Sequence, residues 1–384
     1  MRIAVVAGLY PSKSRPHYGT FVQQLVGAIA KQGVECTVVA PTSLFEARYG
    51  PLDPRYQEEP SKANARIRVY RPRFISASAK RIGPYNTNEL SYRGFRYAAE
   101  RVLRRIAPSI DILYAHFLFP AGRFVASIGR ELDKPSFAAH GDDCIEGPDL
   151  KRGGKDFGDL TGIIAVSRRN KEFCETHLKF PSERIAVFPN GVDNTIFYPR
   201  DKKEMRIKYG LPSDKILVAF SGHFIPRKGP DRVLKAIEPL REVRAVMMGA
   251  GPVRVESPQI VFKKPVPNYQ VAELLSACDL FVLPTMNEGC CNAILEAFAC
   301  GLPVITSKGD FNDEIVDDEV GIRIDPMNIQ EIREAISKMI SNPGLREEKQ
   351  RRSLEHSKKF SLEARAIGII GWMQEMKSKK RENN

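Results

Sequence analysis

Short apolar runs of strand length alternate with helical patterns along almost the whole chain. In the first half, the predicted strands are residues 2–7, 35–40, 111–116, 135–139, 162–166 and 185–188. Helical patterns lie between them, for example at residues 19–31 and 168–178. This alternation is typical of β-α-β units, in which parallel strands form a sheet covered by helices on both faces. It favours the α/β class.

The alternation is interrupted once and then begins again. A turn-rich stretch at residues 189–199 contains Pro-Asn-Gly and separates the two series. The second series of predicted strands is residues 215–221, 243–248, 260–262, 280–283, 303–306 and 321–324. Ligands of such sheets bind beyond the carboxyl ends of the strands. We therefore predict two doubly wound, Rossmann-like domains facing each other across a cleft, at residues 1–195 and 196–360, followed by a helical segment at 361–384.

Length and composition agree with a folded two-domain protein. The chain has 384 residues, of which 42% are hydrophobic and 27% charged, which are ordinary globular values. No segment approaches the roughly 20 apolar residues of a membrane-spanning helix. The apolar run at the N-terminus is too short for a signal peptide. The seven cysteines form no Cys-x-x-Cys pair, and we expect them to be reduced in a cytoplasmic protein.

The net charge of +13 is concentrated in one stretch, residues 66–105. This stretch has eleven Lys and Arg residues against Glu89 and Glu100, and six aromatic residues lie among the basic ones. Basic and aromatic residues together suit an anionic membrane surface. We therefore predict peripheral docking on the inner face of the cell membrane, with an ordinary solvated basic face as the alternative. Nucleic acid is not expected as a partner, because no recognition motif accompanies the charge.

Residues 284–301 carry the clearest chemical signal. They follow a predicted strand, pass through a loop that contains Gly289, and open a helix that ends at Gly301. The backbone amides of the loop and first turn lie at the positive end of that helix, where anions bind. These amides belong to Gly289, Cys290, Cys291 and Asn292.

Two carboxylates flank this anion site. Glu288 lies in the loop, and Glu296 lies about one turn into the helix on the same face as Asn292. Carboxylates are poor phosphate ligands but good acceptors for sugar hydroxyls. The alternative is an ordinary strand-helix junction in which Asn292 caps the helix and both glutamates are solvated.

A second loop, residues 220–230, stands at the corresponding position after another predicted strand. Arg227 offers a guanidinium fork and Lys228 a point charge, which together suit a diphosphate. Gly229 lets the backbone turn before the next helix. The alternative for Arg227 and Lys228 is a solvated surface loop.

A metal site is not expected. His140 ends a predicted strand and is followed by Asp142 and Asp143, while His116 ends another. The two aspartates lack the Asp-x-Asp spacing, and no cysteine or second histidine stands at ligand spacing. Residues 249–251, Gly-Ala-Gly, begin like a dinucleotide fingerprint but lack its third glycine. We therefore predict no metal or other cofactor.

The residues described above resemble a known family. Glu288 and Glu296, with seven residues between them, match the E-x7-E motif of the retaining GT-B glycosyltransferases of family 4, the "glycosyl transferases group 1". The Arg227 loop, the Pro-Asn-Gly-Val-Asp stretch at 189–193 with Phe197, and the strand end at His140 stand where that family has its counterparts.

The resemblance implies roles for individual residues. Glu296 would hold the ribose hydroxyls of a sugar nucleotide, and Glu288 would face the transferred sugar. Lys228 and Arg227 would neutralise the diphosphate, with the amides of residues 289–292 against the sugar and phosphates. Three further residues are predicted in the site. Gly19 and Gly222 lie in the loops that follow the first strand of the first and second domain, respectively, and His140 would lie beside the transferred sugar. His223 replaces the arginine that the family commonly has, which leaves one diphosphate cation unaccounted for.

The resemblance also implies an activity. We expect metal-independent transfer of a hexose, with retention, from a nucleotide sugar to a saccharide acceptor, in particular a lipid-linked one used in cell-surface polysaccharide or glycolipid synthesis. The first domain would bind the acceptor, and the C-terminal helix around Trp372 would return to it. Two alternatives remain open at this point: a nucleotide-sugar epimerase or hydrolase on the same scaffold, and a non-catalytic sugar-binding module.

Overall fold

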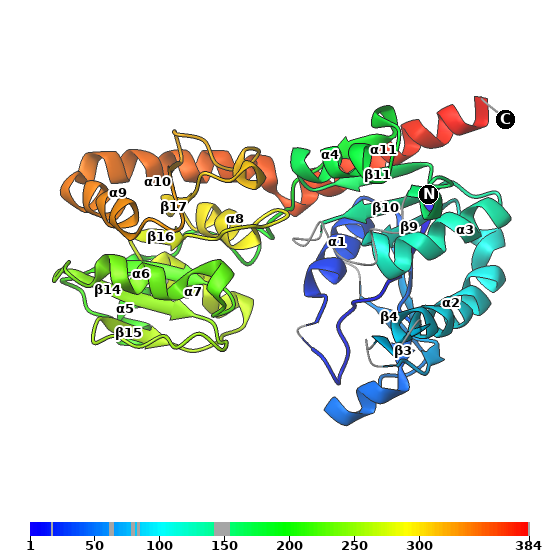
Figure 1. Cartoon of the computed structure of the whole chain (residues 1–384), viewed down its shortest axis with the longest axis horizontal. Helices are drawn as coiled ribbons and strands as arrows, with labels where there is room; N and C mark the ends of the chain where they lie inside the picture. Colours follow the sequence, from blue (N-terminus) through cyan, green and yellow to red (C-terminus); the bar gives the residue numbers. More distant parts are fainter. Residues whose placement is uncertain (17, 61–64, 78–80, 83–84, 142–153, 383–384) are drawn as a thin grey trace. The chain divides into compact units, whose positions relative to one another are not determined.

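A computed structural model describes residues 1–16, 18–60, 65–77, 81–82, 85–141 and 154–382. The chain divides into two compact units, one formed by Met1–Phe188 with Arg365–Asn384 and the other by Pro189–Ala364 (Figure 1). We call them unit 1 and unit 2. Residues 189–195, which we expected in the first domain, belong to unit 2 because the Val192 amide donates to the Phe360 carbonyl, at 2.8 Å.

Unit 1 is built on an eight-stranded sheet with the order β12-β11-β10-β9-β1-β2-β5-β4. Its strands are β1 (Arg2–Ala7), β2 (Glu35–Val39), β4 (Tyr56–Glu59), β5 (Ile67–Tyr70), β9 (Ile112–His116), β10 (Ser136–His140), β11 (Gly162–Ala165) and β12 (Ile185–Val187). All neighbours are parallel except β4 and β5. Short pairs are formed by β3 (Thr42–Ser43) with β6 (Arg73–Phe74) and by β7 (Arg81–Ile82) with β8 (Tyr85–Asn86).

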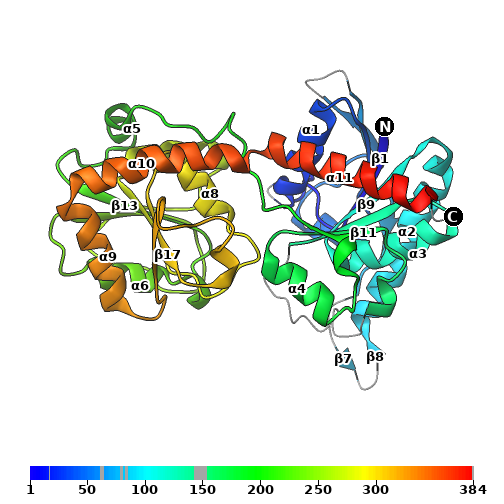
Figure 2. The ribbon, with the colours of Figure 1, turned by 90° about the horizontal axis from the view of Figure 1, so that it is seen from above.

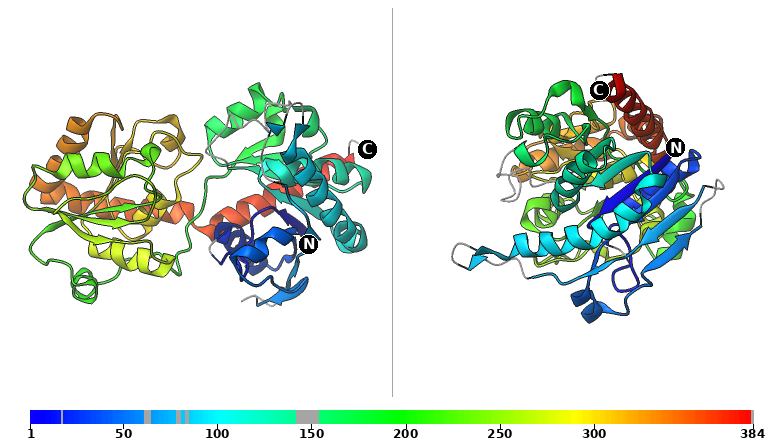
Figure 3. Two further views of the ribbon diagram at one scale, coloured as in Figure 1. Left: turned by 60° about the horizontal axis from the view of Figure 1, so that its bottom comes forward. Right: turned by 90° about the vertical axis from the view of Figure 1, so that its right-hand side faces the viewer.

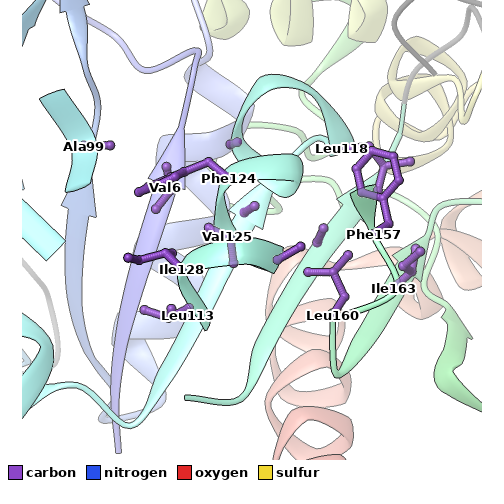
Figure 4. Close-up of a cluster of buried hydrophobic side chains, with 14 of the residues drawn as sticks. Val6, Ala99, Leu113, Leu118, Phe124, Val125, Ile128, Phe157, Leu160 and Ile163 are labelled. Carbon is purple, nitrogen blue, oxygen red and sulfur yellow. The ribbon is translucent and has the colours of Figure 1, made fainter. Parts of the chain in front are cut away.

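Helices cover both faces of this sheet (Figure 3). They are α1 (Thr20–Lys31), α2 (Thr87–Ile106), α3 (Arg123–Glu131), α4 (Arg168–Thr176) and α11 (Leu362–Glu382). Helices α2 and α3 pack on one face, where Phe124 and Ile128 meet Val6 and Leu113 in a buried apolar cluster (Figure 4). The alternation of side chains along each strand sends their neighbours to the other face.

The C-terminal helix packs on that other face of the unit 1 sheet. The ring of Trp372 lies edge-on to Phe137 of β10, with centroids 5.5 Å apart. A Cβ at Gly162 of β11 would stand 2.4 Å from Trp372, so only glycine leaves room for the indole. Figure 2 shows α11 in red running beside β9 and β11.

Arg71 and Arg104, two basic residues of the stretch 66–105, have acidic partners within the protein. Arg71 is only 2% exposed and faces Asp53, with Nε 3.7 Å from the carboxylate. Arg104 pairs with Glu100 and Glu131. Arg71 is therefore not available to a membrane surface, and Arg104, although exposed, is engaged in ion pairs within the unit.

Unit 2 holds a six-stranded parallel sheet with the order β15-β14-β13-β16-β17-β18. Its strands are β13 (Ile216–Ser221), β14 (Val243–Met248), β15 (Ile260–Lys263), β16 (Leu280–Leu283), β17 (Val304–Ser307) and β18 (Gly321–Ile324). Its helices are α5 (Lys202–Tyr209), α6 (Pro230–Ile237), α7 (Asn268–Ala277), α8 (Asn292–Ala299), α9 (Ile329–Ser341) and α10 (Pro343–Ser357). Helices α6 and α9 pack together, as do α8 and α10 (Figure 2).

The predicted fold class, two doubly wound Rossmann-like sheets, is confirmed. Every strand predicted from the sequence is present to within about two residues. The six strands β3 to β8 were not predicted from the sequence. Across the described part of the chain, no helix is long and apolar enough to cross a membrane.

Candidate active site

Two loops of unit 2 meet where the order of its sheet reverses. Strand β13 lies between β14 and β16, so the connections that leave β13 and β16 run to opposite sides. This switch point, beyond the carboxyl ends of the strands, is where open α/β sheets bind their ligands. The loop after β13 is residues 222–229, and the loop after β16 is residues 284–291. They contain the two segments that the sequence marks as an anion site.

The loop after β13 turns on two glycines. Gly222 has φ of 147° and Gly229 has φ of 69°, conformations that residues with a Cβ rarely adopt. A Cβ at Gly222 would lie 3.1 Å from the Lys228 side chain, so the lysine folds back over the start of the loop. The short helical turn η6 (Pro226–Lys228) lies between the glycines and carries both cations.

Glu288 joins the two loops electrostatically. The carboxylate lies 2.9 Å from Lys228 Nζ and 3.3 Å from Arg227 Nη1, and it accepts a hydrogen bond from Thr285 Oγ1 at 3.1 Å. Glu288 is only 7% exposed. Burial lowers the pKa of Lys228, but interactions with Cys291 and Glu288 outweigh it and the pKa is raised. Lys228 is therefore charged at neutral pH.

Arg232 fixes the two loops to each other. This buried residue of α6 donates from Nη1 to the Pro226 carbonyl at 2.9 Å and from Nη2 to the Pro284 carbonyl at 2.8 Å. A Cβ at Gly229 would stand 2.4 Å from the Arg232 guanidinium, so the glycine makes room for it. The sequence analysis missed Arg232. A basic residue on the buried face of the helical pattern after residue 229 is the signal that could have revealed it.

Gly249 and Gly251, which lack the spacing of a dinucleotide fingerprint, serve packing instead. A Cβ at Gly249 would lie 1.9 Å from the Gly222 carbonyl oxygen, and one at Gly251 would lie 2.4 Å from the Phe224 carbonyl. The Phe224 amide donates to the Ala250 carbonyl at 2.9 Å. The stretch after β14 therefore packs against the loop at residues 222–229 and supports its backbone.

The first turn of α8 is held by Asn190. The Asn190 side chain donates from Nδ2 to Asn292 Oδ1 at 2.8 Å and to the Cys290 carbonyl at 3.3 Å. The Asn190 amide lies 3.3 Å from Cys290 Sγ. Cys291 occupies the N-cap position without a capping side-chain bond, and the first N–H groups of a helix have no partner within it. Gly289, Cys290 and Cys291 are buried, whereas Asn292 is exposed.

Glu296 lies one turn into α8, partly buried. Burial raises the pKa of its carboxyl to about 7, and the charge of Lys228 opposes this shift. A carboxyl with such a pKa changes charge in the physiological range, and hydrogen-bond donors from a ligand would favour its ionised form. His223 is exposed at the other loop.

Two predicted site residues belong to unit 1. His140 is fully buried at the end of β10, and neither ring nitrogen has a hydrogen-bond partner among the described residues. Burial lowers its pKa to about 4, so the ring is neutral. Gly19 has φ of 80°, and a Cβ there would stand 2.6 Å from the Leu9 carbonyl carbon, so packing of the loop after β1 requires a glycine. Asp142 and Asp143 lie outside the described residues.

The described residues bear on two further features, possible metal ligands and the state of the cysteines. Those residues contain no group of three or more His, Cys, Asp or Glu side chains placed to hold a metal ion. Six cysteines are described, and all six are buried thiols. The seventh, Cys144, lies outside the described residues.

The geometry of unit 2 thus unites two cations, a helix N-terminus and two carboxylates at one sheet edge. Cations and amides suit a phosphorylated group, and carboxylates suit hydroxyls. The model of the family described as "Glycosyl transferases group 1" matches residues 201–359, and that of "Glycosyltransferase Family 4" matches residues 18–195. The chain belongs to these glycosyltransferases. The predicted family is therefore confirmed.

Individual relatives agree with this assignment. The glycosyltransferase is 28% identical over 355 residues to the putative teichuronic acid biosynthesis glycosyltransferase TuaC of Bacillus subtilis, covering 88% of this chain and 89% of that one. Among solved structures, sucrose-phosphate synthase of Thermosynechococcus elongatus superposes with a TM-score of 0.76 at 17% identity, covering 99% of this chain and 100% of that one. Anabaena HepE in complex with UDP superposes with a TM-score of 0.72 at 16% sequence identity, covering 98% of this chain and 100% of that one. These two show the fold.

Proposed function

We propose that the chain transfers a hexose, with retention and without a metal ion, from a UDP-sugar to a saccharide acceptor carried on a lipid. The contact of Glu288 with both Lys228 and Arg227 carries this proposal, because it places hydroxyl and diphosphate ligands side by side. UDP is chosen because similarly folded Anabaena HepE has been solved with UDP and with UDP-glucose. The name of the Bacillus relative, teichuronic acid biosynthesis, favours a cell-surface polysaccharide or glycolipid as product.

The chemistry follows from the charges at the switch point. The bond between the anomeric carbon and the diphosphate oxygen breaks, and the negative charge grows on the departing UDP. Lys228, Arg227 and the amides at the start of α8 stabilise that charge, as preorganised dipoles and cations do. The acceptor hydroxyl forms the new bond on the same face of the sugar, and its proton passes to the departing phosphate.

His140 contributes as a neutral hydrogen-bonding group. Its ring nitrogens lack partners among the described residues, and a buried polar atom in that state is costly unless a ligand satisfies it. A hydroxyl of the transferred sugar would supply the partner. Because burial lowers its pKa to about 4, His140 stays uncharged through the physiological range.

We also propose that unit 1 docks on an anionic membrane through α2. Residues spaced three or four apart lie along one exposed stripe of this helix: Leu90, Arg93, Tyr97, Arg101 and Arg104. Leu90 is 61% and Tyr97 67% exposed. Apolar and cationic side chains on one helix face suit the interface of an acidic bilayer.

Nucleotide binding tests the proposal first. UDP, GDP, ADP and dTDP are titrated calorimetrically with chelator present, on the wild type and on Glu296→Ala and Lys228→Ala. We expect binding of UDP alone, lost in both variants. Failure of all four nucleotides to bind would refute the donor site. Incubation with a UDP-sugar but no acceptor then separates the transferase from a hydrolase or epimerase, since only the latter two would convert the donor.

A further inference from the structure

Unit 1 contains a cavity of about 320 Å³ at the switch point of its own sheet. Strand β1 lies between β9 and β2, and the residues just after these three strands line the cavity: Leu9, Pro41 and Phe117. This is the position in an open α/β sheet where a ligand is expected. The volume lies within the range of small-molecule sites.

The walls of this cavity are mainly aromatic. Five aromatic side chains come from three separate regions of the chain, and they are Phe74, Tyr92, Phe95, Phe117 and Phe119. Tyr92 and Phe119 are stacked with ring centroids 5.7 Å apart, and Phe74 meets Phe95 edge-on at 6.1 Å. Phe117 and Phe119 are only partly buried, so their rings leave apolar surface open to a ligand.

The polar groups of the wall are largely occupied within the protein. Ser91 Oγ accepts from the Ala77 amide at 2.8 Å and donates to its carbonyl at 3.0 Å. His116 Nδ1 lies 3.0 Å from the Tyr114 hydroxyl, and burial keeps the ring neutral by lowering its pKa to about 3. Neither side chain offers a charge that would bind a charged ligand. The chemistry of the wall therefore selects hydrocarbon over a polar ring.

One edge of the cavity opens beside further apolar surface. Glu46 lines the cavity and belongs to the helical turn η1 (Leu44–Tyr49). Its neighbours Leu44 and Phe45 are 47% and 55% exposed. Glu46 therefore brings a carboxylate, a hydrogen-bond acceptor for a hydroxyl, to this edge of the cavity. An amphipathic molecule fits this combination of an apolar wall, an apolar rim and a carboxylate at the edge.

We propose that this cavity binds the hydrocarbon part of the acceptor, next to the sugar that receives the hexose. The inference rests on the proposed function, because it assigns the acceptor of the same reaction. It adds a binding site and a ligand class: the acceptor is recognised through an apolar aglycone in unit 1, and not through its saccharide alone.

Binding of two matched glycosides tests this site without any donor. Octyl β-D-glucopyranoside, kept below its micelle concentration, and methyl β-D-glucopyranoside share the sugar and differ only in the chain. We expect the octyl compound to bind at least about tenfold more tightly, because burial of even two methylenes has that effect. Equal affinities, or no binding of the octyl compound, would overturn the proposal.

Variants of Phe119 locate the binding. Phe119→Ser should weaken octyl glucoside at least about fivefold, whereas Phe119→Leu, which keeps an apolar wall, should bind it nearly as well as the wild type. Ile207→Ala removes an exposed apolar side chain of unit 2, outside the cavity, and should change nothing. An unchanged affinity of Phe119→Ser for octyl glucoside would refute the assignment. UDP affinity, measured on the same samples, tests the donor site of unit 2 separately, so failure of either proposal can be recognised alone.

Discussion

Glu288 pairs with both cations that we propose for the diphosphate. A phosphate must compete with this carboxylate for Lys228 and Arg227, whose distances to it are 2.9 and 3.3 Å. Glu288→Gln removes the competing charge, and we expect UDP to bind about fivefold more tightly, which corresponds to ~1 kcal/mol for a partly screened ion pair. Transfer should nevertheless fall, because the amide of Gln keeps only one oxygen that accepts hydrogen bonds from the sugar and carries no charge. Calorimetry and steady-state kinetics measure the two effects.

An exposed glutamate of the same unit provides the control for Glu288. Glu348 pairs with Arg352 along α10, at 2.9 Å, and lies outside both loops. Glu348→Gln makes the same chemical change and should leave UDP affinity at the wild-type value. Weaker UDP binding by Glu288→Gln would show that the carboxylate orders the cations for the phosphate instead of competing with it.

Glu296 should make nucleotide binding depend on pH. Burial raises its pKa to about 7, and only the ionised carboxylate accepts hydrogen bonds from both ribose hydroxyls. Binding therefore requires loss of a proton below pH 7, so UDP affinity should rise with pH up to about 7 and then level off. The phosphate of UDP titrates as well, with a pKa near ~6. Glu296→Gln isolates the carboxyl: the part of the pH dependence that persists in this variant belongs to UDP.

At the scale of elements, Arg232 joins the loops after β13 and β16. Its guanidinium serves carbonyls on both, Pro226 and Pro284. Arg232→Lys cannot span them with one ammonium group, so we expect UDP affinity to drop about tenfold as the loops lose their mutual position. We expect Arg232 to act by positioning, because its guanidinium hydrogen bonds go to the loop carbonyls.

A second buried arginine of unit 2 separates positioning from stability. Arg206 of α5 pairs with Asp279 at 2.7 Å and donates to the Ala277 carbonyl at 3.0 Å, away from both loops. Arg206→Lys should lower the melting temperature much as Arg232→Lys does but leave UDP affinity unchanged. If the two variants lose affinity equally, the effect of Arg232 is only a loss of stability.

The docking of α11 on the unit 1 sheet depends on Gly162. Gly162 has no Cβ, which leaves space for the Trp372 ring; a Cβ at this position would lie 2.4 Å from that ring. Gly162→Ala should destabilise the protein by about 1–3 kcal/mol through overpacking. Gly371→Ala, one residue from Trp372 and with no atom within 4 Å of the added Cβ, should stabilise it by about 0.5–1 kcal/mol as a helical alanine. Thermal unfolding measures both changes, and a neutral Gly162→Ala would contradict the packing.

Local pattern predicted most of the architecture because both sheets are parallel and buried. Central strands such as β11 and β16 are continuous apolar runs bounded by turns. The missed strands β4 and β5 are the last two at one end of their sheet. Strand β4 is Tyr-Gln-Glu-Glu and β5 is Ile-Arg-Val-Tyr, so charged and polar residues obscured the apolar pattern. The basic stretch shows the same limit, because sequence does not reveal that Arg71 is buried against Asp53.

The candidate site could be predicted where residues adjoin in sequence and not where distant ones meet. Glu288, Glu296 and Lys228 stand in motifs with fixed spacing. By contrast, the bonds of Asn190 to the start of α8 join residues 102 positions apart. The cavity of unit 1 combines Leu9, Tyr92 and Phe119, whose proximity depends on the order of the strands.

For the whole molecule, a net charge of +13 could attract an anionic membrane through its total amount or through its location on α2. General attraction would depend only on total charge, whereas docking through α2 would depend on where the charge lies. Near an acidic bilayer each basic residue contributes about 1 kcal/mol, and the interaction weakens with salt. Arg93 and Arg101 lie on the exposed stripe of α2 with Leu90 and Tyr97.

Neutralising two charges in either unit distinguishes these possibilities. Arg93→Gln with Arg101→Gln should weaken binding to phosphatidylserine-containing vesicles roughly thirtyfold, the product of two such contributions. Lys203→Gln with Arg351→Gln removes the same charge from exposed positions of unit 2 and should have little effect. Co-sedimentation at low and high salt measures both pairs. Equal losses would mean that the membrane senses net charge, and α2 would then be an ordinary solvated helix.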